Sequence, residues 1–70
     1  MKFTDDILKQ IMGKRVKITC DDMKSYIGVV NDFIYPDDNF NGKAGLIVET
    51  VDDNLVEVQE DEVLEISNIH

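Results

Sequence analysis

Apolar residues recur at two different periods along this chain. Near the N-terminus they fall on one stripe of a helix, at Ile7, Leu8, Ile11 and Met12. Thr4 precedes this stripe as a suitable N-cap, aspartates occupy the first turn, and Gly13 follows as a left-handed stop. The pattern predicts an α-helix over residues 4–12.

Beyond residue 14 the period falls from about 3.6 residues to about 2 residues. In the first such segment, Val16, Ile18 and Cys20 alternate with polar residues. The later segments are rich in β-branched and aromatic residues and are separated mostly by short polar turns. The pattern predicts five strands, at residues 15–20, 25–35, 45–51, 54–59 and 63–69.

Five strands in meander order within 70 residues cannot form a flat layer without leaving one face of the sheet uncovered. Gly28 interrupts the long second strand where a bulge or a sharp bend would fit. We therefore expect a mainly β, single-domain protein over residues 1–70. In this prediction an N-terminal α-helix caps a five-stranded, strongly bent antiparallel sheet that closes on itself as a small barrel.

The negative charge of the chain makes some classes of partner unfavourable. The formal net charge is −8 and the pI is about 4.3, so phosphate backbones and anionic membrane surfaces are repelled. No apolar run approaches the roughly 20 residues that cross a bilayer, and the first residues lack a signal-peptide pattern. We expect a cytoplasmic protein that binds neither membranes nor nucleic acid.

Residues suited to catalysis are scarce. His70 is the only histidine and stands at the end of the chain. Cys20 is the only cysteine, which excludes an internal disulfide and a structural zinc site, and Asp21 and Asp22 beside it disfavour the thiolate. We expect neither an enzyme nor a bound cofactor.

Two segments carry a resemblance to a known family. Residues 13–33 resemble the first conserved segment of Sm and Sm-like (LSm) proteins, which combines a Gly-Lys-x-Val start with an alternating strand, a turn, an aromatic residue, a glycine and a phenylalanine. The matching positions are Val16, Ile18, Asp22, Tyr26, Gly28, Val30 and Phe33. Residues 58–66 occupy the place of the second segment, a short turn between the last two strands. The resemblance implies a small SH3-like barrel with a helix in front.

The chain departs from that family at the positions that hold RNA. Ile34 stands where the family has an aspartate that helps to hold a base, and Gln59 and Glu60 replace an Arg-Gly pair that clamps RNA. The turn glycine of the first segment is Met23 here. Without that arginine, and with excess negative charge, RNA binding is not expected to carry over.

Residues 36–45 begin like a calcium-binding loop. Asp37, Asn39 and Asn41 would take ligand positions one, three and five of such a loop, with Gly42 at its sharp turn. The bidentate carboxylate belongs at position twelve, which is Val48, and Glu49 comes one residue too late. Asn, Asp and Gly also dominate ordinary turns, so we interpret the segment as a solvated loop and keep a weak calcium site as an alternative.

The remaining prediction is a surface for a protein partner. Tyr35, Asp37, Asp38 and Phe40 combine aromatic and acidic side chains in this loop, although Phe40 is equally expected to fold back over the end of the barrel. Self-association through the edge strands is a further possibility, which the local glutamates oppose. The alternative functions are an Sm-like ring that binds RNA through Lys14, Arg15 and Lys17, and a weak calcium-binding loop protein.

Overall fold

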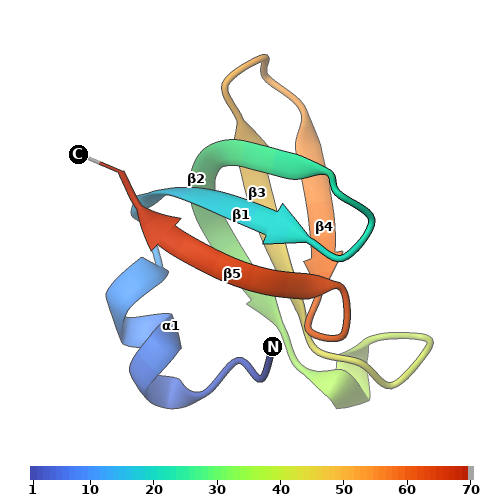
Figure 1. Cartoon of the computed structure of the whole chain (residues 1–70). Helices are drawn as coiled ribbons and strands as arrows, with labels where there is room; N and C mark the ends of the chain where they lie inside the picture. The colour runs from blue at the N-terminus through green and yellow to red at the C-terminus, as the bar shows by residue number, and fades with distance from the viewer. Residues whose placement is uncertain (70) are drawn as a thin grey trace.

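One short helix and five antiparallel strands make up the computed structural model, which describes residues 1–69 (Figure 1). This confirms the mainly β fold with an N-terminal helix. The elements in chain order are α1 (Asp5–Ile11), β1 (Arg15–Cys20), β2 (Ser25–Ile34), the 3-10 helix η1 (Pro36–Asp38), β3 (Gly45–Thr50), β4 (Leu55–Gln59) and β5 (Val63–Asn68).

Helix α1 begins and ends through local backbone chemistry. The hydroxyl of Thr4 accepts a hydrogen bond from the backbone N–H of Ile7 at 3.3 Å, as expected of an N-cap. Gly13 has a φ of 74°, which a glycine adopts without steric cost, and it directs the chain into β1. Within residues 1–69 no helix is long and apolar enough to cross a bilayer.

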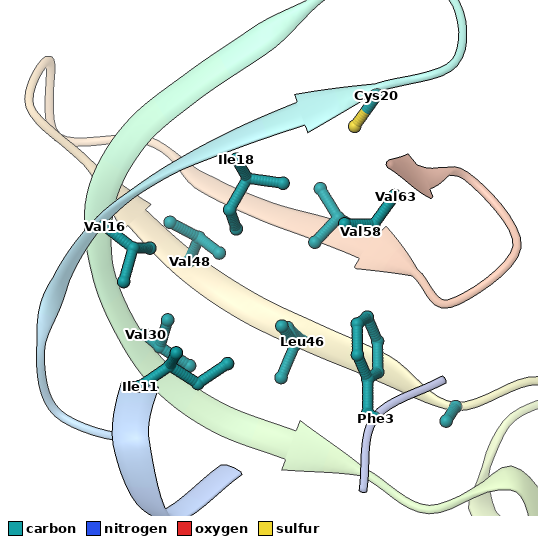
Figure 2. Close-up of a cluster of buried hydrophobic side chains, with 11 residues drawn as sticks. Phe3, Ile11, Val16, Ile18, Cys20, Val30, Leu46, Val48, Val58 and Val63 are labelled. Carbon is teal, nitrogen blue, oxygen red and sulfur yellow. The ribbon is translucent and has the colours of Figure 1, made fainter. Parts of the chain in front are cut away.

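The sheet has the strand order β4-β3-β2-β1-β5 and is open. The expected closure into a barrel is therefore wrong: β4 and β5 are the two edges of the sheet, and they do not pair with each other in the described part of the chain. The N-terminal segment lies against the turn that joins these two edges, because the amine of Met1 donates hydrogen bonds to the carbonyls of Glu60, in that turn, and of Val63, at the start of β5. Phe3 then points into the core (Figure 2).

Strand β2 curves strongly and passes from β1 on one side to β3 on the other (Figure 1). The bulge in β2 lies between Val30 and Asp32, not at Gly28. Gly28 instead permits a close approach of two strands, because a Cβ atom there would lie 2.2 Å from the carbonyl oxygen of Glu49 in β3. A side chain at this position would collide with backbone rather than with a movable group.

The core lies inside the bend of the sheet and is entirely apolar. No polar or charged side chain is buried among residues 1–69. Helix α1 contributes Ile11, and the strands contribute mainly branched aliphatic residues (Figure 2). The buried set is Phe3, Ile11, Val16, Ile18, Cys20, Val30, Ala44, Leu46, Val48, Val58 and Val63. Helix α1 and Phe3 thus cover the part of the core that the open sheet does not enclose.

Candidate functional site

The loop between β2 and β3 is fastened along β4. Its side chains make three contacts with residues that lie 18 positions further along the chain: Asn39 with Glu57 at 2.7 Å, Asn41 with Gln59 at 2.8 Å, and Lys43 with Asp61. The loop therefore keeps a constant register beside β4 and its following turn. This arrangement presents the remaining loop side chains at a fixed end of the molecule.

Tyr35, the first predicted partner-binding residue, is anchored by aromatic packing. Its ring meets that of Phe33 edge-on, with centroids 4.8 Å apart. Phe33 in turn meets the buried Phe3 edge-on at 6.4 Å. Tyr35 remains 64% exposed although it is connected to the core in this way. Its ring is thus held in place and still accessible to a partner.

Phe40 does not fold back over the end of the sheet. Its side chain is 96% exposed, the highest fraction among the large apolar residues of residues 1–69. A phenylalanine in water forgoes about 1.5–3 kcal/mol of burial energy, so its exposure in a fastened loop is unusual. Exposed aromatic residues are enriched at the centres of protein interfaces.

The charge around these rings is negative and unneutralised. Asp37 and Asp38 lie in η1 and are exposed. The only ion pair among residues 1–69 joins Lys43 and Asp61. In that pair the hydrogen bond raises the pKa of Lys43 and lowers the pKa of Asp61. Lys43 is the one basic residue of the loop, so its charge is directed to Asp61 rather than to the two aspartates of η1.

The loop geometry does not assemble the calcium ligands of the sequence motif. The amide nitrogen of Asn39 donates to Glu57 and to the carbonyl oxygen of Lys43, which would be the seventh-position ligand. Val48, at position twelve, is fully buried, and Glu49 is exposed on the opposite side of β3. Across residues 1–69 no group of three or more His, Cys, Asp and Glu side chains is arranged to hold a metal ion.

Cys20, the only thiol of the chain, lies in the core. Burial raises its pKa, and the charges of Asp22, Glu62 and Asp21 raise it further. The thiolate is therefore strongly disfavoured at neutral pH. His70 lies outside the described residues.

A second group of exposed apolar side chains was not predicted from the sequence as a surface. Ile27, Val51 and Leu55 are 40%, 64% and 67% exposed, and Ile27 and Val51 line a shallow groove of about 360 Å³. A signal was present, because β2 and β3 carry apolar residues at consecutive positions and not only at alternate ones. The sequence could not say which of the two apolar faces would be covered.

Comparisons with known proteins do not assign this chain to a class, so its class is described from the structure alone. No protein-family model, no curated protein sequence and no solved structure matches the chain. The structure itself defines a mainly β protein with one short helix and an open five-stranded antiparallel sheet.

Proposed function

We propose that the chain is a cytoplasmic, noncatalytic interaction module with an Sm-like or SH3-like fold, and that it binds a protein partner. The binding surface consists of Tyr35, Asp37, Asp38 and Phe40, which we call the aromatic–acidic surface. The observation that carries this proposal is the 96% exposure of Phe40 in a loop that three side-chain contacts fasten to β4 and its following turn. A fastened aromatic side chain loses little conformational entropy when a partner covers it.

The chemistry of the surface favours a partner with basic and apolar side chains. Asp37 and Asp38 have no cationic partner among residues 1–69, and the net charge of the chain is −8. Lysine or arginine side chains of a partner would be attracted by these carboxylates and by the faces of the two aromatic rings. Much of the charge contribution should appear in the rate of association and should weaken as salt is added.

The direct test is a pulldown with the immobilised chain, in which proteins captured by wild type and by variants are compared. Phe40→Ser and the double reversal of Asp37 and Asp38 to Lys should each lose the same captured proteins. Met23→Asn is the matched control, because Met23 is an apolar side chain 93% exposed in a different turn. Unchanged capture by both loop variants would show that the aromatic–acidic surface does not bind the partner.

A ring that binds RNA is the second candidate function, and one observation favours it. The open edges of the sheet are β4 and β5, which are the strands that pair between neighbouring subunits in the Sm-like proteins that the sequence resembles. Light scattering should then report a hexamer or heptamer, and a gel shift with U-rich and A-rich oligonucleotides at low salt should show binding. A particle smaller than a hexamer at every protein concentration, together with the absence of a shifted band, would argue against the ring.

A further inference from the structure

The side of the sheet that faces away from the core carries an ordered pattern of charge. In antiparallel strands, residues directly opposite one another point to the same side of the sheet. One such row runs across four strands, from Arg15 in β1 through Val29 in β2 and Glu49 in β3 to Leu55 in β4. We call this side the outer face of the sheet.

The neighbouring row repeats the same order. Lys17 in β1 is opposite Ile27 in β2, and the carbonyl of Ile27 accepts a hydrogen bond from the N–H of Val51 at 3.1 Å. Asp52 follows Val51 at the start of the β3–β4 turn and lines the same groove. The outer face is thus basic on β1, apolar at Ile27 and Val29 of β2, and acidic and apolar on β3, β4 and their turn. Asp32, after the bulge in β2, adds an exposed carboxylate to the same face.

The charges of this face have no oppositely charged partner within the described chain, although Asp52 accepts hydrogen bonds from the side chains of Thr50 and Asn54. Arg15 and Lys17 are exposed, and the single ion pair of residues 1–69 involves neither of them. Val51 and Leu55 are 64% and 67% exposed. A face with unpaired cations on one side, unpaired carboxylates on the other and apolar residues between them calls for a partner with the reverse order.

We propose that this partner is a second copy of the chain, bound outer face to outer face around a two-fold axis near β2. A rotation by 180° exchanges the two sides of the face, so that it is complementary to itself. Arg15 and Lys17 of one copy then lie over Glu49 and Asp52 of the other copy, and the same contacts recur across the axis. A uniformly acidic or uniformly basic partner would instead meet like charge on half of the face.

The size of the face sets the strength of the contact. Strands are spaced about 4.8 Å apart, so four strands and a few residues along each cover only a few hundred Å². Interfaces that bury less than about 1,200 Å² in total are weak and transient. The dimer should therefore form at high protein concentration and dissociate on dilution, and added salt should weaken it.

Sedimentation equilibrium between about 10 μM and about 1 mM protein tests the dimer over the range expected of a weak complex. Leu55→Glu should weaken association at least about tenfold, because it places a carboxylate on an apolar position of the face, at the β4 end of the row. Leu64→Glu is the matched control, since Leu64 is 66% exposed but lies on β5 next to the end of β1 that holds Cys20, away from the rows of Arg15 and Lys17. This control should associate like wild type, and Phe40→Ser should do so too, which separates the dimer from the aromatic–acidic surface.

A charge swap keeps the test independent of folding defects. Arg15→Glu should weaken the dimer, and adding Glu49→Lys in the same chain should restore it, because Arg15 and Glu49 share one row and each reversed charge again faces its opposite across the axis. Circular dichroism would confirm that each variant keeps its sheet. A wild-type chain that stays monomeric at the highest concentration overturns the proposal. Equal loss in Leu55→Glu and Leu64→Glu, loss in Leu64→Glu alone, or no restoration by the swap also overturns it.

Discussion

Replacement of Gly28 by alanine adds only one methyl group, but it should destabilise this protein more than so small a change usually does. The new Cβ would lie 2.2 Å from the carbonyl oxygen of Glu49, and 2.8 Å from both the carbonyl carbon of Glu49 and the Cα of Thr50. Ordinary contacts between such atoms are about 3.5–4.0 Å, so β3 must retreat from β2 by about 1 Å. The neighbouring atoms are backbone, and no rotamer change can relieve the collision.

The cost can be estimated from its parts. Overpacking costs about 1–3 kcal/mol, and stretching a hydrogen bond of the β2–β3 ladder adds about 0.5–1.5 kcal/mol. The gain from replacing a flexible glycine in the unfolded chain offsets about 0.5–1 kcal/mol. The expected net loss is between about 0.5 and 4 kcal/mol, with a middle value of about 2 kcal/mol, against a total of roughly 3.5–10 kcal/mol for a domain of this length. The melting temperature should fall by about 10–20 °C.

Gly45→Ala provides the matched control. Gly45 is also a buried strand glycine opposite a neighbouring strand, but its Cβ would meet the carboxylate of Glu57 at 2.6 Å. The exposed side chain of Glu57 can swing aside at the cost of its hydrogen bond with Asn39, so this variant should lower the free energy of unfolding by no more than about 1 kcal/mol. Urea titrations and thermal melts followed by circular dichroism would measure both variants. Equal effects of the two substitutions would refute the backbone-collision argument.

Three further predictions concern local features. Met23 has a φ of 72°, so Met23→Gly should stabilise the chain by about 0.5–1 kcal/mol in urea titration, while Met23→Ala, which keeps the strained backbone, should not. Thr4→Ala should lower the free energy of unfolding by about 0.5–1 kcal/mol and Thr4→Ser should not, since only the hydroxyl caps α1; equal losses would contradict the cap. The pKa of Asp61 is lowered by Lys43, so the stability from this pair is present at neutral pH and is lost as the pH falls below about 5. Asp61→Asn should therefore be less stable than wild type at pH 7 and equal to it in strong acid, and a constant difference in pH-dependent melts would count against the ion pair.

The helix and strands could be predicted because their signals are local. The predicted ranges differ from the observed elements by at most one residue at either end, since a helix period, a strand period, an N-cap and turn residues each act over a few neighbouring positions. Thr4 and Gly13 perform the roles that their residue types suggest. The bend was also foreseen, although the sequence placed it at Gly28 without showing what that glycine approaches.

The candidate site was only partly accessible to sequence reasoning. Tyr35 and Phe40 were proposed from their residue types in an acidic loop, but their exposure depends on packing against residues far away in the chain. Tyr35 is held through Phe33 to Phe3, and the loop is held by contacts to residues 18 positions later. The exposed apolar residues of β2, β3 and β4 follow from the choice of which face the core covers.

The sequence by itself thus determined the order and type of the elements and the excess of negative charge, because periodicity and composition are properties of neighbouring residues. Only the tertiary structure decided that the sheet stays open, that its two edge strands are β4 and β5, and that Phe40 faces water. These outcomes depend on how far β2 bends and on what the N-terminal helix and Phe3 cover. Such long-range packing has no counterpart in any short stretch of the chain.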